Sequence, residues 1–89
     1  MQKREILVTN RLGLHARASA KVVALAAHFR SHVTLVYAGR RASARSIVAV
    51  MLLAASMGST LVLEVEGPDE ADAMTAMVAL IDARFGENV

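Results

Sequence analysis

The sequence contains no cysteine, which excludes disulfide bonds and thiolate-held metal sites from both fold and chemistry. It also has no apolar leader, because its start, MQKREILVTN, alternates between polar and apolar residues. The longest apolar stretch, IVAVMLLAA, is too short to span a bilayer. We therefore expect a cytoplasmic protein with no membrane insertion. Aromatic residues are limited to Phe29, Tyr37 and Phe85, which indicates a core of aliphatic side chains and methionine.

Acidic residues are nearly absent from the first half of the chain. Residues 1–45 hold nine Lys and Arg against a single acid, Glu5, whereas residues 46–89 hold only Arg84 against seven acids. An imbalance of this size favours a basic face that meets an anionic partner. The alternative is that the two halves interleave in space, so that their charges mix.

Four segments carry the pattern of β-strands. Residues 2–9 and 60–66 alternate between polar and apolar, and residues 32–37 (HVTLVY) are rich in β-branched side chains. Ala38-Gly39 forms a turn into a short strand near residues 40–43.

Three segments between the strands carry the period of helices. The first begins at Ala16 and ends by Ser31; the second is capped by Ser46, runs through Ile47–Leu53 and stops by Gly58; the third follows the turn at residues 67–69 and ends at Gly86. The apolar stripes are Ala18, Val22, Leu25, Ala26 and Phe29 on the first helix, and Met74, Met77, Val78, Ile81 and Phe85 on the third.

The element order is therefore β-α-β-β-α-β-α. Because each helix presents one apolar stripe, the simplest arrangement places all three on one face of a four-stranded antiparallel sheet. We expect an α+β open-faced two-layer sandwich, formed as one domain by residues 1–89.

His15, in the stretch NRLGLHARAS, falls at the position that caps the first helix. Histidine is not among the preferred capping residues, so helix stability alone does not explain it. The positive end of the helix disfavours a protonated imidazole and leaves a nitrogen lone pair available. A nucleophilic nitrogen beside unpaired amides suits one task, which is to accept a phosphoryl group.

Neighbouring residues strengthen this anion site. The backbone amides of Ala16, Arg17 and Ala18 belong to the first helical turn, and the Arg17 guanidinium is suited to gripping phosphate oxygens. Gly13 gives the loop a backbone freedom that lifts His15 clear of the surface. By themselves these residues indicate a phosphate or anion site.

Two motifs at their expected separation resemble the HPr family of histidine-containing phosphocarriers. They are Gly13-Leu14-His15-Ala16-Arg17 with Ala18-Ser19, and Arg45-Ser46-Ile47 with Val50-Met51. The resemblance covers nearly the whole chain. It implies a carrier in the bacterial phosphoenolpyruvate-dependent phosphotransferase system, which is not a stand-alone catalyst and needs no cofactor. His15 would accept a phosphoryl group from enzyme I, on the ring nitrogen nearer the backbone, and pass it to enzyme IIA domains, with Arg17 stabilising the group.

The resemblance also implies regulation at Ser46, by an HPr serine kinase/phosphorylase where an organism has one. Ser46 is equally well explained as a helix cap. A phosphate at this position would add negative charge to a docking surface and weaken association with an acidic partner.

We expect partner docking to use apolar residues of the second helix beside a basic rim. Not all side chains of that helix fit inward, and an exposed aliphatic patch is typical of a reusable interface. The expected docking residues are Arg11, Lys21, Arg45, Ile47, Val48, Met51 and Leu52. We expect the protein itself to be a monomer. Many members of the family have proline where this chain has Ala18, a change that affects rigidity more than chemistry.

Other functions find less support. His28 and His32 have a zinc-like spacing without further ligands, so no metal site is predicted, and no glycine-rich phosphate loop is present. A small RNA-binding module would fit the basic half but lacks stacking aromatics, so no nucleic acid partner is expected. A regulatory phosphocarrier of the nitrogen branch would use the same histidine and is the remaining alternative.

Overall fold

A single antiparallel sheet organises the computed structural model, which describes residues 1–88. Its strands are β1 (Gln2–Leu7), β2 (His32–Tyr37), β3 (Arg40–Ser43) and β4 (Thr60–Glu66), and they lie in the order β1-β4-β2-β3. Every neighbouring pair is antiparallel, with β4 between β1 and β2. All four predicted strands are confirmed, although the first ends two residues earlier than expected, at Leu7.

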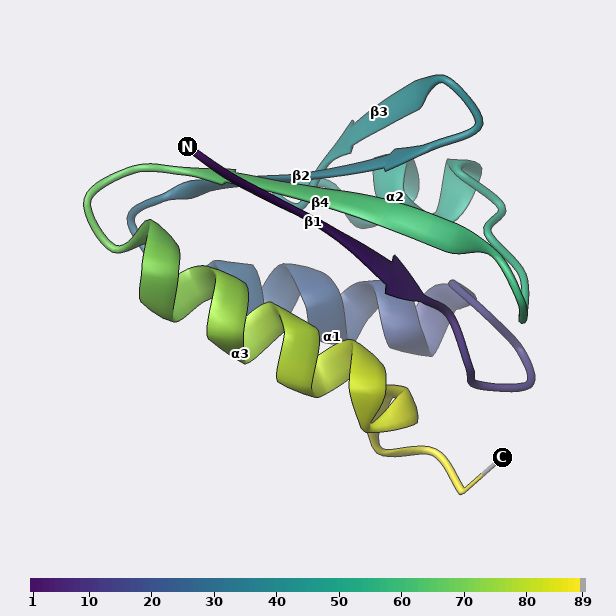
Figure 1. Ribbon diagram of the computed structural model, residues 1–89. Helices are drawn as coiled ribbons and strands as arrows, with labels where there is room; N and C mark the ends of the chain where they lie inside the picture. Colours follow the sequence, from purple (N-terminus) through teal and green to yellow (C-terminus); the bar gives the residue numbers. More distant parts are fainter. Residues whose placement is uncertain (89) are drawn as a thin grey trace.

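Helices cover one face of this sheet (Figure 1). The helices are α1 (Ala16–Ala26), α2 (Ile47–Leu52) and α3 (Glu70–Asp82), followed by a short 3₁₀ turn, η1 (Arg84–Gly86). The long helices α1 and α3 run side by side beneath the strands, and the short α2 packs against α1 and β3. The open-faced α+β sandwich and its β-α-β-β-α-β-α order are confirmed.

The core lies between the sheet and the helices. In the register, Leu61 of β4 pairs with Ile6 of β1, and Leu63 of β4 pairs with Leu35 of β2. All four side chains are buried, so alternate residues of neighbouring strands share the covered face. From the helices, Val22, Met77 and Ile81 complete a fully buried aliphatic layer. This layer holds α1 against the sheet and thereby places its N-terminal end, which carries His15.

The first helix ends earlier than the sequence predicts. It stops at Ala26 instead of continuing towards Ser31, because the amides of His28 and Phe29 donate to carbonyls three residues earlier in the chain, not four as in an α-helix. Ser31 is held elsewhere: its backbone amide donates to the carboxylate of Asp69 at 2.9 Å, and its hydroxyl donates to the same carboxylate. These bonds lower the pKa of Asp69, chiefly through the hydroxyl of Ser31, and they tie the end of α1 to the start of α3.

Phe85 is buried as predicted, but not as part of the last helix. α3 ends at Asp82, and Arg84, Phe85 and Gly86 all adopt left-handed backbone conformations, with φ of 55°, 55° and 79°. Such conformations are costly for residues other than glycine, so burial of the Phe85 ring must offset them. The reversal turns the chain back towards the first helix.

The two oppositely charged halves of the sequence interleave on the open face of the sheet. Arg41 of β3 donates two hydrogen bonds to the carboxylate of Glu64 on β4, and Lys3 of β1 lies 3.7 Å from it. The pKa of Glu64 is lowered, chiefly by its hydrogen bonds from Arg41. Part of the basic charge of the first half is therefore used in ion pairs across the sheet. The remaining basic side chains are available to a partner.

Candidate functional site

His15 stands where the sequence places it, as the residue that caps α1. Its backbone is extended (φ −75°, ψ −179°), and its carbonyl accepts the first helical hydrogen bond, from Ser19 at 2.9 Å. The preceding loop is fixed to the protein: the amide of Leu14 donates to the carbonyl of Ala55 at 2.9 Å, and the Leu14 side chain is buried. These contacts fix the loop and thereby the position of His15.

The backbone amides in the first turn of α1 are free to bind an anion. Within residues 1–88, the amides of Ala16, Arg17 and Ala18 have no hydrogen-bond acceptor, and the side chain of His15 does not cap the helix. The three N–H groups therefore point their partial positive charge towards the space beside the imidazole. The His15 side chain is 26% exposed, so an incoming group can reach the ring.

Glu87 completes the site and is the residue that sequence reasoning missed. Its carboxylate lies 2.5 Å from Nε2 of His15, although the two residues are far apart in the chain. Hydrogen bonds from His15 and then Asn10 lower the pKa of Glu87, with added influence from the charges of His15 and Lys21. An ionised carboxylate only accepts hydrogen bonds, so Nε2 is the donor in this contact, and in the neutral ring the lone pair then lies on Nδ1.

Two further contacts hold the segment that carries Glu87. Asn10 is fully buried, and its side-chain Nδ2 donates to the carboxylate of Glu87 at 3.1 Å and to the carbonyl of Gly13 at 2.9 Å. The ammonium group of Lys21 donates to the carbonyl of Phe85 at 2.5 Å. Lys21, predicted as a docking residue, thus binds the end of the chain to α1.

Arg17 and Arg11 are exposed on either side of His15 in the chain. Among residues 1–88 neither has an ion-pair partner, in contrast to Arg41 and Lys3 on the sheet. Their charges are therefore available to an anion or an acidic surface.

The predicted docking helix has the expected form. The Ser46 side chain accepts a hydrogen bond from the amide of Ala49 at 3.1 Å, which confirms Ser46 as the cap of α2. The aliphatic side chains of α2 that we predicted to be outside are exposed. We call these four the apolar patch: Ile47, Val48, Met51 and Leu52. Further exposed apolar side chains lie on other segments, at Met1, Leu7, Leu12 and Met57.

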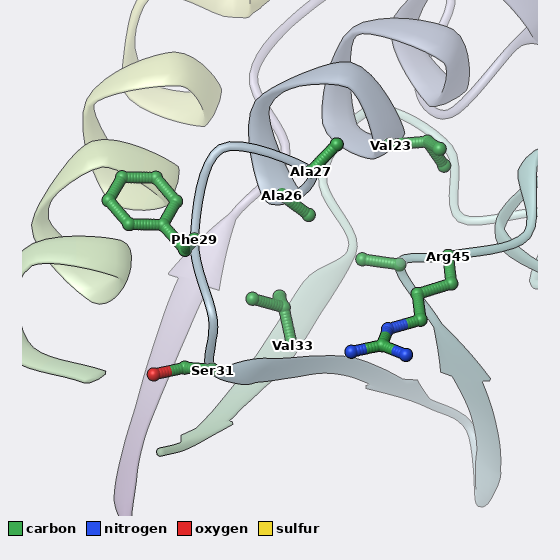
Figure 2. Close-up of a pocket in the computed structure, with 8 residues that line it drawn as sticks. Val23, Ala26, Ala27, Phe29, Ser31, Val33 and Arg45 are labelled. Atoms are coloured by element: carbon green, nitrogen blue, oxygen red, sulfur yellow. The ribbon is translucent and has the colours of Figure 1, made fainter. Parts of the chain in front are cut away.

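Arg45 has a second environment besides the predicted rim. Its guanidinium lies over a hollow of about 290 Å³, between the end of α1 and the start of β2, lined mainly by small apolar side chains such as Val23, Ala26 and Val33 (Figure 2). His15 and Glu87 are not among its lining residues. This hollow is therefore separate from the His15 site.

Aromatic side chains offer no platform for stacked bases. Phe85 is fully buried, and Phe29 and Tyr37 are partly buried against the core. Stacking on exposed aromatic rings is the usual way such sheets read RNA, so the RNA-binding alternative gains nothing from the structure. No helix of residues 1–88 has the length and apolar character needed to cross a membrane.

Comparison with known proteins identifies the family. The family model described as "PTS HPr component phosphorylation site" matches residues 2–83. The chain belongs to the HPr family. It is 54% identical to the phosphocarrier protein HPr of Cupriavidus necator over 87 residues, 98% of each chain. A solved structure of HPr from Thermoanaerobacter tengcongensis superposes with a TM-score of 0.95 at 37% identity, over the full length of both chains.

The nitrogen-branch alternative has a relative of its own. The chain is 40% identical to the phosphocarrier protein NPr of Shewanella violacea over 85 residues, which are 96% of this chain and 93% of the relative. Relatives named HPr nevertheless predominate, and several are more similar. This chain is an HPr-type phosphocarrier of the phosphotransferase system.

Proposed function

We propose that Nδ1 of His15 is the atom that accepts and donates the phosphoryl group. One observation supports this assignment above the others: Glu87 occupies Nε2, while Nδ1 has no hydrogen-bond partner within residues 1–88. In the transfer, the lone pair of Nδ1 bonds to phosphorus as the bond to the donor atom breaks. The free amides of Ala16, Arg17 and Ala18 and the Arg17 guanidinium then bind the phosphoryl oxygens.

The donor is enzyme I, charged by phosphoenolpyruvate, and the acceptors are enzyme IIA domains. This chain supplies the group-carrying histidine and its partners complete the transfer, so it does not act as a stand-alone catalyst. We assign docking to the apolar patch together with Arg11 and Arg45, because exposed aliphatic side chains combined with exposed, unpaired arginines suit a partner surface that is apolar and acidic. We expect the carrier to work as a monomer in the cytoplasm.

Labelling with enzyme I and phosphoenolpyruvate tests the proposed function. We expect one phosphate per chain, labile in acid and stable in base, as for a phosphorus–nitrogen bond. A chain that takes no label, or a label that survives acid, would contradict the proposal.

Arg17→Ala is expected to slow phosphoryl transfer without disturbing the fold. Loss of a charge-assisted hydrogen bond costs about 1.5–3 kcal/mol, which corresponds to a rate about tenfold to a hundredfold lower. Rapid-quench measurement of transfer from enzyme I gives the rate, and circular dichroism checks the fold. Arg30→Ala removes another exposed arginine, outside the site, and this variant should transfer normally. Equal rates in the two variants would remove Arg17 from the mechanism.

We also propose that Ser46 is a regulatory phosphorylation site for an HPr serine kinase/phosphorylase. Its hydroxyl is exposed and lies at the start of the apolar patch. A phosphate would sit at the favourable end of a helix and keep the cap, but would add negative charge where an acidic partner docks. The expected consequence is weaker docking with an intact fold.

Ser46→Asp and Ser46→Asn separate charge from capping. Both replacements are good helix caps, so each should keep the free energy of unfolding within about 0.5 kcal/mol of the original. Only aspartate adds charge, and repulsion of about 1 kcal/mol would lower the affinity for enzyme I about fivefold. Titration calorimetry measures both affinities. If the two variants bind equally well, the electrostatic account of Ser46 is wrong.

A further inference from the structure

We infer that Glu87 is a positioning residue for the phosphoryl transfer, which holds the proton on Nε2 of His15 while the phosphoryl group is bound at Nδ1. The inference rests on the proposed function of His15. It concerns the phosphorylated form, in which the ring has given its Nδ1 lone pair to phosphorus.

The charge on the imidazole explains why the carboxylate matters. When Nδ1 bonds to phosphorus and Nε2 keeps its hydrogen, the ring becomes a cation, and no proton enters or leaves. On transfer to the next protein, the N–P bond breaks, its electron pair returns to Nδ1, and a neutral imidazole is left. If Nε2 first lost its proton to water, the departing group would be an imidazolate anion, a much poorer leaving group.

The structure places a carboxylate where it opposes this loss. Glu87 accepts from Nε2 at 2.5 Å, and its side chain is only 13% exposed, so water screens the interaction weakly. An opposite charge at this distance stabilises the ring cation and keeps the proton in place. The other polar groups that influence the Glu87 carboxylate are the neutral amide of Asn10 and the more distant ammonium of Lys21.

The segment that carries Glu87 is held in place by a strained backbone turn, a buried ring and several hydrogen bonds. Arg84 and Phe85 are both in left-handed conformations, and the chain reverses through them towards α1. Phe85 is buried, Lys21 holds its carbonyl, and buried Asn10 links Glu87 to the carbonyl of Gly13 in the His15 loop. The carboxylate is therefore preorganised beside the ring before the phosphoryl group arrives.

The test is the pH dependence of phosphoryl loss from the isolated phosphorylated protein. The phosphoimidazole is labile while its ring is a cation and more stable once Nε2 is deprotonated, so the rate falls as pH rises. Glu87→Gln keeps the size of the side chain but removes the charge. We expect the midpoint of the fall to move about one unit towards lower pH, since a nearby charge has an effect of this order.

Three comparisons make the result decisive. Asp82→Asn removes one negative charge from an exposed position on α3 and should leave the midpoint unchanged. Glu87→Asp restores the charge and should recover part of the shift. ¹⁵N NMR of the unphosphorylated ring should show the proton on Nε2 in the original protein and a mixture of tautomers in Glu87→Ala.

An unchanged midpoint in Glu87→Gln, with normal labelling, would overturn the role of Glu87 and leave His15 as the carrier. An equal shift of the midpoint in Asp82→Asn would mean that the effect comes from the net charge of the protein. This result would also overturn the role of Glu87. If the original protein takes no label at all, the proposed function itself fails, which is a distinguishable result.

Discussion

His15→Ala is expected to abolish phosphoryl labelling by enzyme I and phosphoenolpyruvate. The substitution removes the nitrogen nucleophile that stands beside the free amides of α1. The fold should remain, because the His15 side chain makes no capping hydrogen bond and is partly exposed. The measurement is the amount of acid-labile phosphate per chain, with circular dichroism to check the structure.

His28→Ala is the matched control for this experiment. His28 is exposed beyond the end of α1, where the opposite helix end offers carbonyl groups instead of amides to an anion. This variant should take up the full amount of phosphate. A label that persists in His15→Ala, or disappears in His28→Ala, would refute the assignment of the carrier atom.

Gly13→Ala is expected to destabilise the protein by about 2–4 kcal/mol, from left-handed strain of about 1–2 kcal/mol together with overpacking. Gly13 has φ of +63°, and an added Cβ would lie 2.4 Å from the carbonyl oxygen of Ala55 and 2.8 Å from Cα of Ser56. Both are backbone atoms, so the loop that carries His15 would have to move. Denaturant unfolding measures the loss, and we expect phosphoryl transfer to slow as well.

Gly39→Ala shows how much of this loss is steric. Gly39 also has a positive φ, +78°, but an added Cβ there meets no atom within 4 Å. It should cost only the conformational part, about 1 kcal/mol, and leave transfer unaffected. If both variants lost the same stability, the close contact of Gly13 with residues 55–56 would not explain why glycine is needed at position 13.

Local patterns proved sufficient for most of the architecture. The alternation in β1 and β4, the period of α1 and the cap at Ser46 depend on residues a few positions apart, and each is seen in the structure. The position of His15 at the start of α1 was accessible for the same reason. The boundaries were less certain: the early end of α1 depends on Ser31 and Asp69, which lie on different elements and meet only in the folded chain.

The partner of the carrier histidine was beyond reach of the sequence. Glu87 appears there as one more acid after a helix-ending glycine, with no period or motif to relate it to His15. Its contact exists only because Phe85 is buried in a left-handed turn, a conformation that no propensity favours. The pairing of Arg41 with Glu64 has a similar origin, in the alignment of β3, β2 and β4.

The amino-acid sequence alone thus determined the order of strands and helices, the family, and a reactive imidazole at the start of a helix, because these follow from short-range spacing. Only the tertiary structure decided which ring nitrogen stays free, since that depends on a carboxylate brought from the far end of the chain. Contacts between distant segments arise from packing of the whole core. The local sequence around the residues that make them therefore does not predict these contacts.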